Sequence, residues 1–389
     1  MALILTFLGK GGTGKTTLAI ATAKHMASTG KRVLLALSEP PSVIGLMLGQ
    51  VKEGTPGVIE SNLEAVNLRS AALLERSWED VKQLEAQYLQ KPFFKEVFGQ
   101  ELGLLPGMDG ALALYALRDY DQSGKYDVIV YDGDGDRETL RMLGTPEIMS
   151  WYIRRFRDVI VNSDVGQALS PFLGPISSAI LNVDLSKDNF AAPTQEANST
   201  LDAGKAAITN PNRVAAYLVT TGDKTALAKA MDLWGSAQQV GVTVGGMILN
   251  KSVIHDTQAA EAANSFQELY DTFDHEAIDV STATAQFEPL SISIVPFEKS
   301  KNWQVLQKAL PDFTEATRAP KPITLDVAQK SVSLFLPGFD KKQVKLTQYG
   351  PEITIEAGDQ RRNILLPPAL SGKPVKGAKF QDRYLNISF

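Results

Sequence analysis

The nine residues from 9 to 17 are all glycine, lysine or threonine, in the order GKGGTGKTT. Glycines leave room for successive backbone N–H groups to curve around a phosphate. Lys15, which follows the last glycine, is placed to reach β- and γ-phosphate oxygens, and the hydroxyl of Thr16 suits Mg²⁺. The pattern predicts a nucleotide-binding loop made of Gly9, Lys10, Gly11, Gly12, Thr13, Gly14, Lys15, Thr16 and Thr17.

The segments on either side of this loop are a predicted strand and a predicted helix. Residues 3–8 form a short apolar run typical of a buried parallel strand, and residues 18–28 are helix formers closed by Gly30. The alternative is a glycine-rich turn that only begins a helix, but it does not explain why a lysine and two threonines follow in register. We therefore expect a phosphate site between strand and helix.

The loop contains a second lysine, Lys10, which has two interpretations. It either points into solvent or acts on a phosphate group. The string Lys-Gly-Gly-x-Gly-Lys-Thr-Thr resembles the deviant Walker A sequence of the MinD, ParA, nitrogenase iron-protein and arsenical-pump group of ATPases. In that group the early lysine crosses a dimer interface to the partner's nucleotide. The resemblance implies a homodimer in which Lys10 acts in trans, like an arginine finger.

Composition restricts the classes of function. The chain has 389 residues and a net charge of −5, which leaves room for about two or three domains and no basic surface typical of nucleic-acid binding. No run of 18 or more apolar residues is present, and the first strand begins at Ala2, so we expect no membrane span and no signal peptide. We expect a cytoplasmic protein, or a protein of the plastid stroma if a transit peptide precedes this sequence.

The chain has no cysteine and only three histidines, which are far apart in the sequence. Disulfides, thiolate zinc sites and iron–sulfur clusters all need cysteine sulfur. We therefore expect ATP and Mg²⁺ as the only cofactors, with no zinc and no iron–sulfur cluster.

Beyond the loop, apolar runs alternate with helical segments in the manner of an α/β fold with a mostly parallel, doubly wound sheet. A helix is expected over residues 224–239 and a short one over 303–310. The expected strands are residues 32–37, 127–132, 214–219, 243–250 and 291–295.

Asp132 follows a buried strand and begins the sequence DGDGDRETLRML. A carboxylate at this point can hold Mg²⁺ through water, and the glycines after it allow a switch that senses the γ-phosphate. Calcium is an alternative, because Asp132, Asp134 and Asp136 alternate as in an EF-hand loop. However, the twelfth loop position is Leu143 instead of glutamate, and a strand precedes the loop.

Three segments carry a closer resemblance: residues 105–114, residues 126–132, and residues 139–143 with Pro146. They resemble the family of arsenical-pump ATPases and guided-entry ATPases that target tail-anchored proteins. That family has a Pro-Gly-x-x-x-Ala-Leu element before the strand and a switch of the form Asp-Thr-Ala-Pro-Thr-Gly-His-Thr-Leu-Arg-Leu-Leu after it. The resemblance covers roughly residues 1–310 and implies a P-loop ATPase domain.

The resemblance also implies roles for single residues. Asn250 matches the asparagine that recognises adenine, and Pro296 and Phe297 match the segment that covers the base from the other side. Glu39 matches the switch aspartate that positions the attacking water. Two of these positions have plainer explanations, because Asn250 can cap the next helix and Pro296 can end a strand. The implied catalytic set is Lys10, Lys15 and Glu39.

Departures from the family pattern modify this prediction. Glu39 is one methylene longer than aspartate, and a misplacement of about 1 Å can cost about 10²-fold in rate, so we expect slow hydrolysis. Residues 133–138 replace the usual Thr-Ala-Pro-Thr-Gly-His of the second switch. The zinc-binding Cys-x-x-Cys of many targeting homologues is missing, so packing and nucleotide alone would hold a dimer.

Two segments, about 60–122 and 147–210, are expected to be inserted helical subdomains. Residues 78–88 and 151–160 have helical apolar periodicity, and further large apolar residues occur at 93–98 and 172–181. One interpretation is a buried helical core. The other is an apolar surface, closed by dimerisation, that holds a hydrophobic helical client such as a tail-anchored membrane segment. Membrane contact would then occur only through the client.

The composition changes after residue 310. Residues 311–322 contain three prolines and are expected to be a linker, after which apolar residues alternate with period two, as in a small β-sandwich over residues 323–389. Residues 336–344, 353–355, 361–367 and 378–388 resemble the α-crystallin domain of small heat-shock proteins. Such a domain either binds partners along its grooves and edges or stabilises the ATPase as a packed appendage.

Together these features resemble a divergent, cysteine-free branch of the guided-entry ATPases found in cyanobacteria and plastids. They predict a homodimeric chaperone that ATP closes around its client and that opens after hydrolysis. The alternatives are a slowly hydrolysing, nucleotide-stabilised scaffold and a MinD-like or ParA-like positioning ATPase. An arsenite-pump subunit would need thiols for the metalloid, which this chain lacks.

Overall fold

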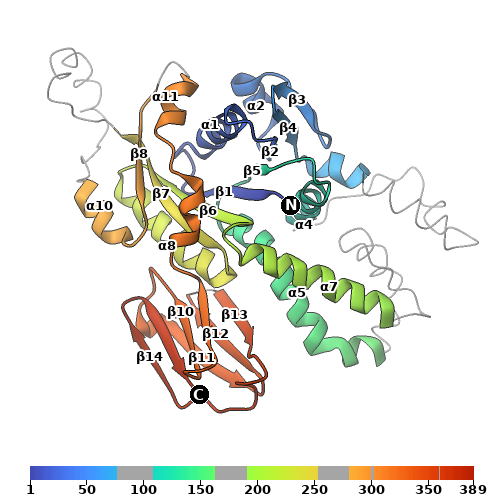
Figure 1. Ribbon diagram of the computed structural model, residues 1–389, viewed down its shortest axis with the longest axis vertical. Coiled ribbons are helices and arrows are strands. Elements are labelled where there is room, and N and C mark those ends of the chain that lie inside the picture. The colour runs from blue at the N-terminus through green and yellow to red at the C-terminus, as the bar shows by residue number, and fades with distance from the viewer. Residues whose placement is uncertain (77–107, 163–190, 253–279, 299–301, 359) are drawn as a thin grey trace, which may run out of the picture.

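The computed structural model describes residues 1–76, 108–162, 191–252, 280–298, 302–358 and 360–389 (Figure 1). The helical periodicity expected over residues 78–88 lies outside these ranges. So do the apolar residues expected at 93–98 and 172–181.

Within the described ranges, an eight-stranded sheet forms the centre of the N-terminal part, in the order β3-β4-β2-β5-β1-β6-β7-β8. Neighbouring strands pair in parallel except at one edge, where β3 runs antiparallel to β4. Parallel neighbours need crossover connections, which helices provide here. The strands are β1 (Leu3–Leu8), β2 (Val33–Leu37), β3 (Gly57–Glu60), β4 (Leu63–Asn67), β5 (Val128–Asp132), β6 (Val214–Thr220), β7 (Thr243–Ser252) and β8 (Ile292–Pro296).

Helices cover both faces of this sheet and bury its strands on two sides. Successive side chains of a strand point to opposite faces, so Leu5 and Phe7 of β1 pack with α1 and α11, whereas Leu8 packs with α4, α5, α8 and α10. The helices are α1 (Lys15–Ser28), α2 (Pro41–Leu48), α4 (Met108–Gln122), α5 (Arg137–Asn162), α7 (Ala191–Ile208), α8 (Lys224–Val240), α10 (Val280–Phe287) and α11 (Trp303–Lys308).

The strand order brings three loop segments to one edge of the sheet. β5 lies between β1 and β2, with Tyr131 opposite Thr6 and Asp132 opposite Leu37. Because the carboxyl ends of parallel strands meet at the same edge, the loop after β1, Glu39 after β2 and Asp132 converge. Ligands of open α/β sheets bind in this kind of crevice.

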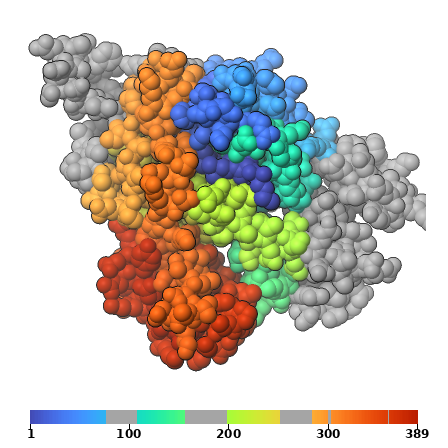
Figure 2. Space-filling model, viewed as in Figure 1, coloured from blue at the N-terminus to red at the C-terminus, as the bar shows by residue number. Residues whose placement is uncertain are grey.

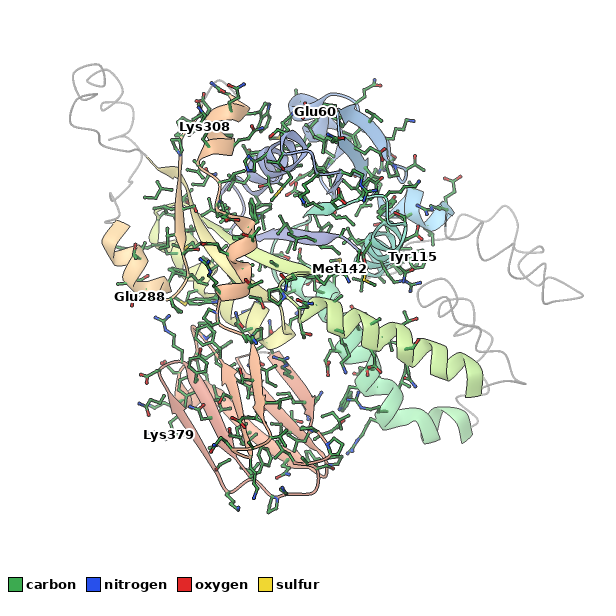
Figure 3. All side chains as sticks on the ribbon, in the orientation of Figure 1. Glu60, Tyr115, Met142, Glu288, Lys308 and Lys379 are labelled. Carbon is green, nitrogen blue, oxygen red and sulfur yellow. The ribbon has the colours of Figure 1, made fainter. Side chains whose placement is uncertain are left out.

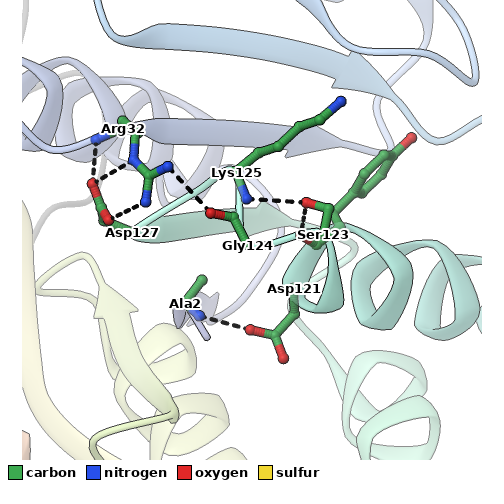
Figure 4. Close-up of polar contacts among 8 residues, drawn as sticks. Ala2, Arg32, Asp121, Ser123, Gly124, Lys125 and Asp127 are labelled. Carbon is green, nitrogen blue, oxygen red and sulfur yellow. Dashed lines mark hydrogen bonds and ion pairs between the residues drawn. The ribbon is translucent and has the colours of Figure 1, made fainter.

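The amino ends of the same strands are joined by charged groups (Figure 4). Arg32, before β2, donates to both carboxylate oxygens of Asp127, before β5, at 2.7 and 3.2 Å, and to the backbone oxygen of Gly124 at 3.1 Å. Asp121 at the end of α4 accepts the backbone N–H of Ala2 at 2.7 Å. These contacts fasten the strands at the end opposite the crevice.

The first predicted insert differs from the expectation at its borders. β4 belongs to the central sheet, and α4 packs on that sheet, so both ends of the segment 60–122 are part of the α/β core. The sequence of β4, LEAVN, lacks the continuous apolar run of the other strands, which is why periodicity did not reveal it. Met142 of α5, labelled in Figure 3, lies in the same core as α4.

In the second predicted insert, α5 and α7 lie side by side beneath the sheet (Figure 1). None of the helices in the described parts of the chain combines the length and hydropathy that a bilayer crossing requires.

The segment expected to be a linker, residues 311–322, is packed against the sheet. A 3-10 helix, η1 (Phe313–Arg318), buries Phe313 and Ala316, and the Phe313 ring meets the ring of Tyr217 edge-on with centroids 4.8 Å apart. The Tyr217 hydroxyl donates to the backbone oxygen of Phe313 at 3.3 Å. The segment with three prolines is therefore an ordered connection, because Phe313 and Ala316, which lie between these prolines, are buried against the sheet.

Residues after η1 form two antiparallel sheets, in the orders β14-β15-β10-β9 and β11-β12-β13, which enclose a separate apolar core. The expected period-two alternation is met where Val332, Leu334, Ile353 and Ile355 are buried. In the space-filling view these strands form a distinct lobe (Figure 2). The predicted α/β fold with a C-terminal β-sandwich is confirmed. Its strands are β9 (Ile323–Asp326), β10 (Ser331–Phe335), β11 (Val344–Tyr349), β12 (Glu352–Ala357), β13 (Gln360–Leu365), β14 (Gly377–Gln381) and β15 (Tyr384–Ser388).

Candidate nucleotide-binding site

The loop between β1 and α1 has the backbone that a phosphate site needs. Gly12 and Gly14 have φ angles of 83° and 93°, in the left-handed region that glycine adopts without strain. Gly9 passes so close to β6 that a Cβ atom there would lie 2.1 Å from the backbone oxygen of Val219. Around Gly11 and Gly12 a Cβ would meet nothing within 4 Å, so the loop's outer side is open.

Lys15 is folded back over this loop. Its Nζ donates to the backbone oxygens of Gly9 at 3.1 Å and Lys10 at 3.4 Å. Burial lowers the pKa of Lys15, while the nearby carboxylates, Asp132 first among them, act in the opposite direction. A partly buried ammonium group held by two carbonyl oxygens is placed to exchange them for phosphate oxygens.

Asp132 is buried, with 2% of its surface exposed, and only part of its carboxylate is hydrogen-bonded among the described residues. Its side chain is hydrogen-bonded to Thr16, and its Oδ2 atom has no hydrogen-bond partner in the described part of the chain. Burial raises the pKa of Asp132 to about 7. A buried carboxylate oxygen without a partner, beside a hydroxyl, fits the water shell of a Mg²⁺ ion, which takes few protein ligands.

Glu39 and Asp132 lie near each other at the crevice. The Glu39 carboxylate contributes to the raised pKa of Asp132 and opposes the lowered pKa of Lys15. The side-chain amide of Asn67, at the end of β4, donates to the backbone oxygen of Glu39 at 3.2 Å. Glu39 is therefore positioned beside the phosphate loop, and its role in orienting water stays a prediction.

The segment after Asp132 contacts the phosphate loop directly, which sequence reasoning did not anticipate in detail. The N–H of Gly9 donates to the backbone oxygen of Gly135 at 2.8 Å, and the N–H of Gly135 donates to the Thr139 hydroxyl at 3.0 Å. A Cβ on Gly135 would lie 2.4 Å from the backbone oxygen of Phe7, and the φ angle of Gly135 is 65°. Only glycine fits here, so the DGDGD sequence carries a packing requirement as well as acidic groups.

Lys10 has a partner within its own chain. Its Nζ donates to the Thr225 hydroxyl at 3.0 Å and lies 3.6 Å from Oδ1 of Asp223, the residue that caps α8. Burial alone would raise the pKa of Asp223, but hydrogen bonds from Thr221, Thr225 and the N–H of Ala226 outweigh it and lower this pKa. The Asp-x-Thr pair was missed, although an acidic residue before a helical run is a recognised cap signal.

Asn250 is buried at the end of β7, and its Nδ2 donates to the backbone oxygen of Thr13 at 2.7 Å. The residue therefore braces the phosphate loop in this structure, and recognition of adenine stays a prediction. Pro296 ends β8, and Phe297 follows it with 43% of its surface exposed. Asn250 thus contacts the phosphate loop, and the roles of Pro296 and Phe297 at the adenine stay predictions.

Comparisons with known proteins agree with this geometry. Residues 2–301 match the family described as anion-transporting ATPase, and residues 328–389 match the HSP20-like domain found in ArsA. The chain is 24% identical over 398 residues to the "Putative arsenical pump-driving ATPase" of Chlorobaculum tepidum, covering 99% of this chain and 95% of the relative. It is 25% identical to "Protein Rv2184c" of Mycobacterium tuberculosis, covering 100% and 96%.

A relative with another name matches part of the chain. The "ATPase GET3" of Mycosarcoma maydis is 26% identical over 174 residues, which is 44% of this chain and 49% of the relative. Both resemblances drawn from the sequence, to the ATPase family and to the heat-shock domain, are confirmed. The chain belongs to the anion-transporting ATPase family and is an ATPase with a C-terminal HSP20-like domain.

Proposed function

We propose that this ATPase works as a homodimer that binds a hydrophobic helical client, such as a tail-anchored membrane segment, and releases it after hydrolysis. The observation that carries the proposal is an apolar stripe on α5. Ile148, Met149 and Tyr152 lie within about one turn of this helix and are 47%, 37% and 47% exposed. Residues four apart share a helix face, so Ile148 and Tyr152 present one surface.

Different residues of the crevice bind different parts of ATP. The N–H groups of residues 9–17 and Lys15 would hold the phosphates, and Thr16 and Asp132 would hold Mg²⁺, with Asp132 acting through water. Glu39 would orient the attacking water. When bound, Mg²⁺ neutralises charge on the phosphate oxygens. Asn250, Pro296 and Phe297 hold the adenine.

Lys10 supports the dimer. It lies in the phosphate loop, but its ammonium group contacts Asp223 and Thr225, and 47% of its side chain is exposed. An exposed ion pair is weak, about 0–1 kcal/mol, so a partner's nucleotide can compete for Lys10. In the proposed dimer each Lys10 leaves Asp223 and stabilises the phosphates bound by the other subunit.

The partial match to a relative named ATPase GET3 agrees with the resemblance to the guided-entry ATPases, and the apolar stripe on α5 supplies a surface for a helical client. The relatives named as arsenical pump-driving suggest a different cargo. A metalloid bound through thiols has no ligand in this chain, which contains no cysteine. The client interpretation is therefore the better supported of the two.

The test is photocrosslinking of a synthetic 20-residue apolar helix to the full chain in ATP, with Glu39→Gln to slow hydrolysis; a helix of about this length matches a membrane span. We expect crosslinking in ATP that falls at least about fivefold in the double substitution Ile148→Asp, Tyr152→Asp. Val58→Asp is the matched control, since Val58 is 77% exposed on edge strand β3, away from α5. Equal crosslinking by all three proteins would overturn the client proposal.

A slowly hydrolysing scaffold is the second candidate, and Glu39 favours it. The longer side chain places its carboxylate differently from the aspartate of the family pattern. Turnover by the wild type and by Glu39→Asp separates the two candidates. A rise of about tenfold or more in Glu39→Asp would show that the natural residue restrains hydrolysis.

A further inference from the structure

One helix, α8, contacts three parts of the protein that are far apart in sequence. It packs on β6 and β7 of the central sheet, on α5, and on β13 of the C-terminal sandwich (Figure 1). Consistent with this position, its residues from 233 to 239 are all buried. With 17 residues it extends about 25 Å, from the edge of the crevice to the sandwich.

The N-terminal end of α8 contacts the phosphate loop. Asp223 caps the helix by accepting the N–H of Ala226 at 2.9 Å, and the same oxygen, Oδ1, accepts the Thr225 hydroxyl at 2.5 Å and lies 3.6 Å from Nζ of Lys10. The charge that holds Lys10 in this structure therefore also fixes the first turn of α8. Movement of Lys10 to another phosphate group would remove one of the contacts of this cap.

The middle of α8 contacts the segment that follows Asp132. Arg137, the first residue of α5, donates to Asp232 at 2.7 Å, and Lys229 shares the same carboxylate at 3.4 Å. Arg137 directly follows Asp136, one of the carboxylates that act on Lys15. A shift of this switch segment would therefore move or break the contact between Arg137 and Asp232, which is a second contact of α8 with the crevice.

The C-terminal end of α8 contacts the sandwich. Gly235 lies so close to the loop after β10 that a Cβ would be 2.4 Å from the backbone oxygen of Pro337 and 2.7 Å from the ring of Phe339. Arg362 of β13 donates to the backbone oxygen of Gln238 at 3.0 Å. Part of Arg362 reaches solvent, yet burial of its guanidinium lowers its pKa to about 10.

This contact region also contains unsatisfied polar atoms. Both amide atoms of Gln238 and of Gln239, and Nε1 of Trp234, are buried without a hydrogen-bond partner among the described residues. Docking of the sandwich on α8 is therefore close, and it buries polar groups of α8 as well as apolar ones.

We propose that α8 couples nucleotide binding in the crevice to docking of the C-terminal sandwich. The phosphate loop contacts Asp223, which caps α8, the switch segment contacts Asp232 within α8, and the sandwich packs on the C-terminal end of the helix. A rigid helix that loses the first two contacts shifts against the third. Because coupling between sites is reciprocal, undocking of the sandwich changes nucleotide affinity by the same factor. The inference rests on the nucleotide binding of the proposed function. It assigns the sandwich a regulatory role that is separate from the client surface on α5.

Hydrogen exchange tests the coupling in the full-length protein. Peptides covering residues 335–339 and 360–365 are followed without nucleotide, with ADP, and with a non-hydrolysable ATP analogue. We expect at least about a threefold change in exchange rate between ADP and the ATP analogue. The change should shrink in Asp223→Asn, because asparagine keeps the helix cap but loses the charge that holds Lys10. Binding of the analogue with identical exchange in both peptides would overturn the coupling.

Nucleotide affinity tests the reverse direction. Arg362→Met should change the Kd for a fluorescent ATP analogue by about two- to thirtyfold, although Arg362 lies at the far end of α8 from the crevice. Arg361→Met is the matched control, because Arg361 is the neighbouring residue of β13 and is exposed. Arg362→Lys should bring the Kd part of the way back to the wild-type value. Wild-type affinity in Arg362→Met, with an unchanged circular dichroism spectrum, would contradict the inference. Failure of the wild type to bind nucleotide would overturn the proposed function as well.

Discussion

The two ends of the central strands differ in how their charged groups are satisfied. At the amino ends, Arg32 has a bidentate bond with Asp127, and Asp121 accepts both Ala2 and Arg213, at 2.7 Å each. At the carboxyl ends, Asp132 has a buried oxygen without a partner among the described residues, and Lys15 is held by backbone carbonyls. The paired charges at the amino ends stabilise the fold. The charged groups at the carboxyl ends lack such pairing and are available to bind a ligand.

This comparison predicts opposite effects for substitutions at the two ends. Carboxyl-end substitutions should reduce activity and spare or raise stability. Amino-end substitutions should reduce stability and spare activity.

The largest effect is expected at Asp132. Asp132→Asn keeps the shape and removes the charge, and it should reduce ATP hydrolysis by about 10²-fold or more, because a charge-stabilising group at a phosphoryl-transfer site is lost. The pKa of this carboxyl is raised to about 7, so its favourable contribution is present below its unfolded pKa, near 4, and is lost as pH rises through 7. Wild type without nucleotide should therefore lose stability between about pH 5 and pH 8, by at most about 3 kcal/mol.

Chemical denaturation at about pH 5 and about pH 8 checks this prediction. The asparagine side chain in Asp132→Asn does not titrate, so the variant should show a smaller decline than the wild type. Asp202→Asn is the control, since Asp202 is exposed on α7, is not among the groups that shift the pKa of Asp132, and should leave the decline unchanged. An equal decline in both variants and the wild type would contradict the unsatisfied-carboxylate interpretation.

A smaller effect on stability is expected at Asp121. Asp121→Ala leaves Arg213 without its carboxylate, in a pair whose side chains are only 19% and 11% exposed. We expect a loss of about 2–4 kcal/mol in the free energy of unfolding. Hydrolysis per folded molecule should stay within about twofold of the wild type. A fall in turnover as large as that of Asp132→Asn would remove the distinction between the two ends.

The smallest effect is expected at Asp127. The hydrogen bond from the Arg32 side chain lowers the pKa of Asp127 to about 2, so its contribution is present above about pH 4 and is lost as pH falls through 2. Both side chains are largely exposed, at 54% and 37%, so solvent screening limits the loss in Asp127→Asn to about 1 kcal/mol. In thermal melts, the difference between variant and wild type should be larger at about pH 7 than at about pH 2.5. A larger loss at the lower pH would show another origin.

Local patterns predicted which segments of the chain meet at the crevice. The phosphate loop and Asp132 could be read from the sequence because strand, glycines, lysine and acid are adjacent along the chain. The apolar runs of β1, β5 and β6 predicted the sheet for the same reason, whereas β4 was missed because polar residues interrupt it.

Contacts between distant segments could not be predicted. Asp223 lies more than half the chain away from Lys10, and nothing in either segment states that they meet. The same holds for Gly135 against Lys15 and for Arg362 against α8, where each partner has an ordinary local sequence. The packed segment 311–322 shows a related limit, since proline content indicates a break in secondary structure and does not indicate whether the chain is buried.

The central claim is that Lys10 leaves Asp223 to act on the nucleotide of a second copy. Mixing two variants tests it most directly. Lys10→Ala retains the phosphate site but lacks the trans lysine, and Lys15→Ala has the reverse defect, so each alone should be nearly inactive. In an equal mixture, about half of the dimers contain one complete site, and we expect about a quarter of wild-type hydrolysis per chain. Activity of the mixture equal to the average of the separate variants would contradict the trans role of Lys10.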